Sequence, residues 1–363
     1  PPQPFTFTSG VILHNAMNAF AIPGGHVYVF TGLIMNFEDE SQLAGVLSHE
    51  LAHVTQRHVA SRLERAQYLS VGSLLLASGA VAVGALGAGQ SAMLNYSRLD
   101  ENEADQIGLQ YLTKAGYPPS GLVGGFKIMR QKSWMAGASV PAYLSTHPDI
   151  GDRINGIQAR LSSFPASIRN RTFDNRRFKR VQTVLWGRYG DSQAALQRFS
   201  GKDALSCMGR GMVLSRRNNV REAAAAFDQA LQLAPKDPLV LREAGTFHYR
   251  KGDMARAEGL LRQAMQLDKN DFMARFFYAR MLDETGRAQP YYTEVLRAVP
   301  EAADVHEAYA RSLGSIGKTG LAYIHMAYSA IYSNNRKLAE RYFKQAKAKT
   351  EKSADSAAFR KLD

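Results

Sequence analysis

The residues with the clearest chemical potential form one short motif, His49-Glu50-Leu51-Ala52-His53. Residues four apart lie on one face of a helix, so the imidazoles of His49 and His53 can hold one cation. Glu50 lies about 100° around the helix, where its carboxylate can face a water on that cation. Neutral imidazole nitrogens suit Zn²⁺, and a catalytic zinc keeps a position open for water. The motif predicts one zinc per chain, with a chance match as the alternative.

A third metal ligand is expected outside this helix. His58 lies five residues beyond His53, about 140° around a continuous helix, and is expected to be a surface or packing residue. Glu101 and Asp105 are better placed, because the Glu-x-x-x-Asp spacing puts both carboxylates on one helix face. Glu101 could then complete a His₂Glu site while Asp105 accepts a hydrogen bond from a ligating imidazole. The alternative is an ordinary acidic helix start.

The elements that must position these residues can be read from hydrophobic spacing and turn residues. Apolar residues recur every three or four positions over 40–65, which predicts a helix that Asp39 or Ser41 can cap. Pro23-Gly24-Gly25 separates two extended stretches, 18–22 and 26–30, and predicts a hairpin. Further helices are expected at 98–116, 119–134 and 151–162.

A charge-free segment, 66–97, joins the two helices that carry the metal motif. Its length could span a bilayer, but Gly and Ala dominate it. We expect a lid near the cleft or a membrane-apposed segment rather than a span.

The second half contains a sequence repeat. A unit that starts at Ala204 and another that starts at Pro238 share small and large residues at matching positions, with weaker copies from Phe272 and before the C-terminus. The shared positions are held by Gly211, Ala223, Phe227 and Ala230, then by Gly245, Ala257, Leu261 and Ala264. This small–large–small pattern is typical of tetratricopeptide repeats, in which small residues let two helices touch. A generic Ala-rich helical bundle is the alternative.

Charge divides the chain in the same place. The 363 residues carry a net charge of +13, yet residues 1–165 hold 10 basic and 11 acidic residues, whereas 166–363 hold 35 and 21. We predict a metal-binding domain at 1–165, a basic connecting stretch at 166–200 and a repeat domain at 201–363. The single Cys207 excludes an intramolecular disulfide framework and is expected to be a packing residue. Residues 1–4 show no basic or apolar leader, so no signal peptide is visible.

Several motifs together resemble a known family. They are the His49–His53 motif, then Tyr96-Ser97-Arg98 leading into Glu101-Asn102-Glu103-Ala104-Asp105, then Thr146-His147-Pro148 with Arg153-Ile154. This set resembles the HtpX-type and CAAX-prenyl-protease-type zinc peptidases. With repeats behind it, the chain resembles the periplasmic members that act in outer-membrane protein assembly and quality control.

The resemblance implies an α+β, mostly helical chain: a zincin-type metalloprotease domain with a small edge-strand sheet, followed by an all-α tetratricopeptide-repeat domain. It implies zinc ligands at His49, His53 and Glu101, Glu50 as general base, and Asp105 behind the ligands. It also implies that His147 approaches the metal, either in the open position at rest or beside the transition state. Residues Asn18, Ala19 and Phe20 match an edge strand that pairs with an extended substrate, although a plain sheet edge is the simpler reading.

The function implied is a zinc metalloendopeptidase of the bacterial periplasm. Its partners would be unfolded or stalled proteins and, through the repeats, the outer-membrane assembly machinery, with peripheral membrane contact through 66–97 as one reading. The competing hypothesis is a chaperone-like binding module with a structural zinc or one latched by His147. Nucleic-acid binding through the basic run 169–180 is not expected, because no recognised nucleic-acid motif accompanies it.

Overall fold

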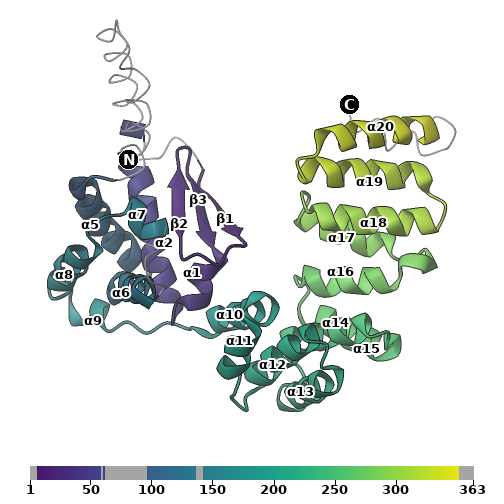
Figure 1. The fold of residues 1–363 in the computed structure, drawn as a ribbon, viewed down its shortest axis with the longest axis horizontal. Helices are drawn as coiled ribbons and strands as arrows, with labels where there is room; N and C mark the ends of the chain where they lie inside the picture. Colours follow the sequence, from purple (N-terminus) through teal and green to yellow (C-terminus); the bar gives the residue numbers. More distant parts are fainter. Residues whose placement is uncertain (1–5, 59, 62–95, 136–141, 351–363) are drawn as a thin grey trace, which may run out of the picture. The chain divides into compact units, whose positions relative to one another are not determined.

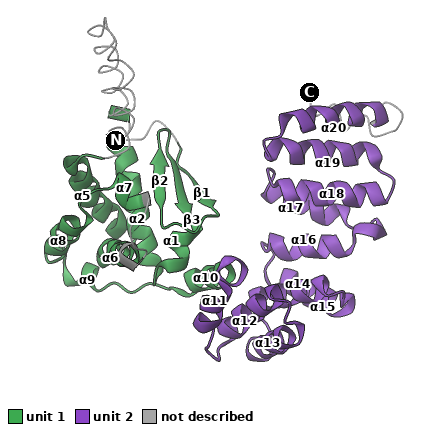
Figure 2. Cartoon of the chain, viewed as in Figure 1, with its two compact units in different colours: residues 1–185 green, residues 186–363 purple. Residues whose placement is uncertain are grey.

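The computed structural model describes residues 6–58, 60–61, 96–135 and 142–350. All but the last two residues of the charge-free segment 66–97, with its predicted lid or membrane contact, lie outside this range. The chain divides into two compact units, residues 1–185 and 186–363 (Figure 2). The boundary falls within helix α10 (Arg176–Tyr189), inside the basic stretch 166–200.

The first unit begins with a three-stranded sheet. The strands are β1 (Thr8–Ile12), β2 (Ala19–Ile22) and β3 (His26–Phe30), in the order β1-β3-β2 (Figure 1). Strands β2 and β3 are antiparallel, with Ile22 opposite His26, so the predicted hairpin is present. Gly24 and Gly25 have φ values of 97° and 88°, which residues other than glycine rarely adopt. Strand β1 runs parallel to β3 and leaves β2 at the other edge of the sheet.

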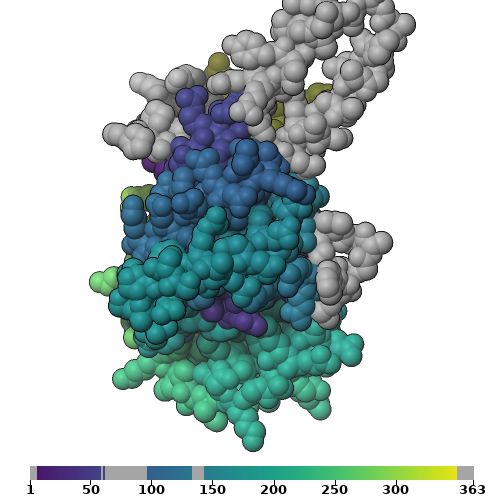
Figure 3. Space-filling model, turned by 90° about the vertical axis from the view of Figure 1, so that its left-hand side faces the viewer, coloured from purple at the N-terminus to yellow at the C-terminus, as the bar shows by residue number. Residues whose placement is uncertain are grey.

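The other elements among the described residues of this unit are helices. They are α1 (Thr31–Asn36), α2 (Glu40–Thr55), α5 (Arg98–Lys114), α6 (Ser120–Met135), α7 (Ala142–Thr146), α8 (Ile150–Leu161), α9 (Ala166–Arg169) and α10. The blue and teal segments that include α5, α6 and α8 form one face of the unit in the space-filling view (Figure 3). Helix α2 packs against both α5 and α6, and β2 packs against α2 as well.

Two glycines allow the close approach of helices to α2. A Cβ at Gly45 would lie 2.6 Å from the backbone of Leu122 in α6, and a Cβ at Gly108 would lie 3.1 Å from the backbone of His49. The second contact draws α5 against the histidine-bearing segment of α2. Glu101 and Asp105 precede Gly108 on α5, so this contact brings their helix face to the histidines.

The sequence prediction of one helix over 40–65 is wrong at its C-terminal end. Asp39 caps the start as expected, because its carboxylate accepts the Gln42 amide. The helix ends at Thr55, however, and Arg57 has a φ of 59° in the left-handed region. The chain therefore changes direction before His58.

The second unit consists of helices. They are α11 (Ser192–Arg198), α12 (Ala204–Arg216), α13 (Val220–Leu233), α14 (Pro238–Arg250), α15 (Met254–Leu267), α16 (Phe272–Met281), α17 (Gln289–Ala298), α18 (Ala303–Ser315), α19 (Thr319–Tyr332) and α20 (Arg336–Thr350), with a short 3₁₀ turn η1 (Asp283–Thr285). Successive helices pack as pairs, α12 with α13 and α14 with α15, which is the arrangement of helical repeats (Figure 1).

The repeat positions explain this pairing. A Cβ at Gly211 would lie 3.0 Å from the Phe227 ring, and a Cβ at Gly245 would lie 2.9 Å from the Leu261 side chain. A glycine in the first helix of each repeat thus admits the large residue of the second helix. Cys207 is fully buried, as a packing residue would be. The predicted fold class, α+β with a small sheet followed by helical repeats, is confirmed.

In the described part of the chain, no helix is both long enough and apolar enough to cross a bilayer.

Candidate metal centre

Four side chains from three separate stretches of the first unit meet in one place. His49 and His53 come from α2, Glu101 from α5, and His147 from the residue after α7. Each offers one nitrogen or oxygen, and these four atoms all lie within 4.8 Å of one another. All four side chains are buried, with exposed fractions of 2% or less. The structure therefore brings together the three ligands expected from the sequence and the histidine implied by the family resemblance.

The spacing of these atoms fits one zinc ion. Tetrahedral ligands about 2.0–2.2 Å from zinc lie about 3.3–3.6 Å from each other. The Nε2 atoms of His49 and His53 are 3.0 Å apart, and the Glu101 carboxylate lies 3.5 Å from each of them. His147 Nδ1 is 3.4 Å from His49 Nε2 and 2.9 Å from Glu101 Oε1. Three nitrogens and a carboxylate are donors that zinc accepts, so the residues present fit this metal.

His49 is oriented from behind by two buried side chains. Asp105 Oδ1 lies 2.9 Å from His49 Nδ1, which leaves Nε2 facing the cluster. Arg153 from α8 donates to both Asp105 oxygens, at 2.8 and 2.6 Å, and also pairs with Glu101. Because Arg153 is only 5% exposed, its charge compensates part of the charge of the two carboxylates from inside the protein. Sequence reasoning gave Arg153 no role; the signal was an arginine beside Ile154 and Ile157 on the buried face of an amphipathic helix.

These contacts set the charges of the metal-free centre. Burial and the Arg153 charge lower the pKa of His49, but hydrogen bonds to Asp105 and Glu101 outweigh them and raise this pKa to about 9. Burial alone would raise the pKa of Glu101, yet the charge of His147 and hydrogen bonds from the three histidines hold it below its usual value. Both shifts favour an ionised Glu101 beside a protonated His49. A metal that binds at this position would displace a proton from His49.

Glu50 differs from the other carboxylates because it lacks a hydrogen-bond partner. Its side chain is fully buried, and neither oxygen has a hydrogen-bond partner among the described residues. His147 Nε2 lies 3.6 Å from Oε1, and the Tyr143 hydroxyl also interacts with this carboxylate. Burial raises the pKa of Glu50 above its ordinary value. A buried carboxylate with free lone pairs beside a metal site can accept a proton from a water held there.

Aromatic rings cover two of the histidines. Tyr143 stacks on His147 with ring centroids 4.2 Å apart, and Tyr96 stacks on His53 at 3.7 Å. Tyr143 is fully buried and belongs to α7. Tyr96 belongs to a motif of the family resemblance but was given no role there, and Tyr143 was not singled out, since an isolated Tyr in an apolar stretch is ordinary core. Their faces restrict how the two imidazoles can turn.

His58 is buried and lies outside the four-donor cluster, which agrees with its prediction as a packing residue rather than a ligand. Its expected position on a distant face of a continuous helix is wrong. The side chain is 5% exposed, and its Nδ1 lies 2.9 Å from Nδ1 of His53. The turn at Arg57 is the physical reason, because it ends the helical geometry on which the prediction rested. His58 lies outside the four-residue cluster and touches it through His53.

The predicted substrate strand lies beside the histidine-bearing helix. Ala19 is 1% exposed and Ala21 packs with Val54 of α2, so one face of β2 is directed at that helix. Phe20 lies on the opposite face, stacked on Tyr28 at 5.3 Å. The backbone oxygen of Asn18 accepts the Phe30 amide. In the described residues, the other edge of β2 pairs with no strand.

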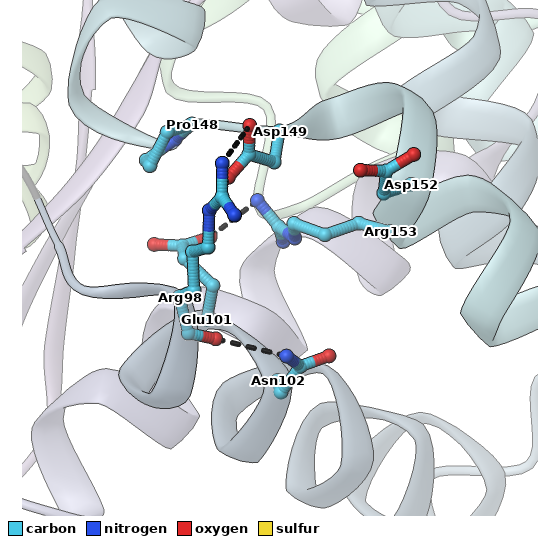
Figure 4. Close-up of a pocket in the computed structure, with 7 residues that line it drawn as sticks. All are labelled: Arg98, Glu101, Asn102, Pro148, Asp149, Asp152 and Arg153. Carbon is cyan, nitrogen blue, oxygen red and sulfur yellow. Dashed lines mark hydrogen bonds and ion pairs between the residues drawn. The ribbon is translucent and has the colours of Figure 1, made fainter.

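A small polar cavity adjoins the cluster. Its volume is about 190 Å³, and Figure 4 shows its lining. The lining residues are Arg98, Glu101, Asn102, Pro148, Asp149, Asp152 and Arg153. The Arg98 guanidinium points at Asp149, with an N–O distance of 2.5 Å. Glu101 belongs to both the cavity lining and the metal centre, and the lining residues Pro148 and Asp149 directly follow His147. The cavity therefore lies next to the metal centre.

Comparison with known proteins gives the class of the first unit. Residues 1–161 match the model of peptidase family M48, and residues 208–272 match a tetratricopeptide-repeat model. Residues 1–161 are therefore similar to M48 peptidases, and residues 208–272 to tetratricopeptide repeats.

Curated relatives share this domain. A putative beta-barrel assembly-enhancing protease of Vibrio cholerae is 38% identical over 175 residues, covering 45% of this chain and 36% of the relative. The beta-barrel assembly-enhancing protease of Yersinia pestis is 29% identical over 243 residues, covering 63% of this chain and 47% of the relative. The mitochondrial metalloendopeptidase OMA1 of Arabidopsis thaliana is 34% identical over 141 residues, covering 38% and 28%. The chain thus spans between about a quarter and a half of the length of these relatives.

Proposed function

We propose that this chain is a zinc-dependent endopeptidase that hydrolyses peptide bonds in protein substrates. The observation that carries the proposal is the fully buried carboxylate of Glu50, whose oxygens make no close hydrogen bond among the described residues, beside four converging metal donors. A purely structural zinc site has no need of such a carboxylate. The M48 match of residues 1–161 supports the same reaction class.

The proposed roles follow from position. His49, His53 and Glu101 would hold the metal, and Asp105 would fix the imidazole of His49. When bound, zinc would supply Lewis acidity, which lowers the pKa of a water and stabilises negative charge on the substrate carbonyl oxygen. Glu50 would take the proton from the attacking water and pass it to the leaving amine nitrogen.

Strand β2 is proposed to align the substrate. An extended segment could add to its free edge through backbone hydrogen bonds, along Asn18, Ala19 and Phe20. Because β2 packs on α2, the added strand would run along the helix that carries Glu50. Such binding recognises the substrate mainly through its backbone and depends little on its side chains. It therefore suits an unfolded or stalled protein chain.

The test is Glu50→Gln. The amide keeps the shape of the side chain but cannot take a proton, so cleavage of an unfolded outer-membrane β-barrel protein should fall by about 10²–10⁴-fold. Zinc content should stay at one per chain. Glu40→Gln is the matched control, because this glutamate of α2 hydrogen-bonds to Tyr117 rather than to the cluster. Cleavage by Glu50→Gln at the wild-type rate would refute the role of Glu50.

The biological setting is proposed from relatives named for β-barrel assembly. The chain would act in the bacterial periplasm in outer-membrane protein quality control, with the helical repeats recruiting the assembly machinery or the substrate. The inactive Glu50→Gln chain should retain β-barrel proteins in complex. If it retains only other proteins, this setting is wrong while the peptidase assignment stands.

A second function is favoured by one contact. His147 Nδ1 supplies a fourth protein donor, where a catalytic zinc holds its water. The resting chain would then be a repeat-based binding module with a latched metal. His147→Ala distinguishes the two, because a latched peptidase gains cleavage when the donor is removed. Absence of cleavage in wild type and variant alike, with zinc bound in both, would favour the binding module.

A further inference from the structure

We propose that His58 is a positioning residue that holds the metal ligand His53 in place through a hydrogen bond between their Nδ1 atoms. This inference rests on the proposed zinc site. It assigns a task to a buried histidine that neither the metal cluster nor the general base uses.

The direction of each hydrogen bond in this contact can be derived. His53 must present an unprotonated Nε2 to a metal, so its proton is on Nδ1. That Nδ1–H points at His58 Nδ1, 2.9 Å away, which must therefore accept. His58 then carries its own proton on Nε2, where Glu103 Oε2 lies 3.2 Å away as an acceptor. One set of tautomers satisfies every atom from Glu103 to the metal.

The surroundings hold this arrangement in place. Tyr96 stacks on one face of the His53 ring. The rings of His53 and His58 meet edge to face, at an interplanar angle of 72°. The left-handed backbone at Arg57 folds His58 back onto the helix it has just left.

The two metal-binding imidazoles are therefore supported differently. Asp105 behind His49 is buried and fixed by Arg153, whereas the support of His53 passes through His58 to Glu103, whose side chain is 53% exposed. Loss of a group that orients a ligating histidine typically weakens metal binding by about 10–100-fold. We expect that loss at His58.

The experiment measures zinc release from the full chain into excess chelator. His58→Ala removes the acceptor, and His58→Phe removes it while keeping a ring of similar size. Both should release zinc about 10–100-fold faster than wild type. In His58→Asn, the side-chain oxygen can replace the accepting nitrogen, so release should return close to the wild-type rate. Glu103→Ala, at an exposed position that folding tolerates, should give a smaller increase.

The matched control is a second histidine pair in the repeat unit. His306 Nδ1 lies 2.9 Å from His325 Nδ1, with no metal cluster among the described residues around it. His306→Ala should leave zinc release unchanged.

The outcomes separate the two proposals. If His58→Phe releases zinc at the wild-type rate, the ring serves only packing. If His58→Phe and His58→Asn release zinc equally fast, the hydrogen bond is excluded. Either result overturns the inference. Wild-type release by Glu103→Ala would overturn the role of that carboxylate. If the wild-type chain binds no zinc at all, the proposed function itself fails. If it binds zinc and the His58 variants hold it as long, only the positioning role fails.

Discussion

The two units contain the same histidine pair in opposite settings. In the first unit His53 faces His58, and in the second His325 faces His306, each pair joined through Nδ1 atoms 2.9 Å apart. The accepting histidine is also held in the same way, by Glu103 in one unit and by the backbone oxygen of Pro300 in the other. The two pairs differ in what surrounds Nε2 of the donating histidine, which is His53 in the first unit and His325 in the second.

In the first unit that nitrogen faces Glu101 and two more imidazoles, and in the second the pair is packed among tyrosine rings. Tyr309 lies 4.4 Å from the His325 ring, and Tyr328 lies 5.1 Å from the His306 ring. No ion pair joins either of these imidazoles to a carboxylate in the described part of the chain. The histidine pair beside Glu101 therefore belongs to the candidate metal centre, whereas the pair among tyrosines is part of the core.

The largest effect on this difference is expected from removal of Arg153, the buried cation that pairs with both Glu101 and Asp105. Arg153→Met leaves Glu101 and Asp105 buried without their partner. The free energy of unfolding of the metal-free protein should fall by about 3–5 kcal/mol. Zinc should recover part of this loss, because it neutralises Glu101. Urea unfolding followed by circular dichroism, with and without zinc, measures both effects.

The repeat unit offers the control for this variant. Arg242 faces two carboxylates of low exposure, Glu243 and Asp271, away from any metal cluster among the described residues. Arg242→Met should also destabilise the chain, but by the same amount with and without zinc. If zinc fails to rescue Arg153→Met more than Arg242→Met, the carboxylates beside Arg153 do not belong to a metal site.

A smaller effect should appear on acidification of the second unit. Burial and the neighbouring His306 lower the pKa of His325 to about 4, while the unfolded chain titrates near 6.5. Above pH 6.5 both states are neutral and the stability is fully present. As the pH falls toward 4 the unfolded chain binds the proton first, so the free energy of unfolding should drop, on the order of 1–3 kcal/mol.

His325→Phe isolates this contribution. The variant keeps an aromatic ring among the tyrosines but has nothing to protonate, so its free energy of unfolding should change less between pH 7 and pH 4.5 than that of the wild type. An equally steep loss in the variant would mean that other groups, including the first unit's histidines, account for the acid sensitivity.

The sequence predicted the parts of the centre that depend on regular geometry. The i, i+4 spacing of His49 and His53 and that of Glu101 and Asp105 hold because α2 and α5 are ordinary helices there. In the repeats, the alternation of small and large residues identified the contacts of Gly211 and Gly245, since each repeat packs against its neighbour in the same way.

What the sequence could not give depends on breaks in regular structure and on tertiary contacts. His58 was misplaced because one left-handed residue, Arg57, reverses the chain just after a helix whose hydrophobic spacing gave no warning. Arg153 was left without a role because its partners Glu101 and Asp105 are about fifty residues away. Tyr96 and Tyr143 look like ordinary core until the imidazoles they cover are in place.

The most direct test of the central claim is the zinc content and ligand set of the purified chain, measured by elemental analysis and zinc-edge X-ray absorption. One zinc per chain with only nitrogen and oxygen neighbours is expected, and Glu101→Ala should lose most of it. A metal-free wild type, a sulfur neighbour, or full zinc in Glu101→Ala would contradict the assignment of this centre.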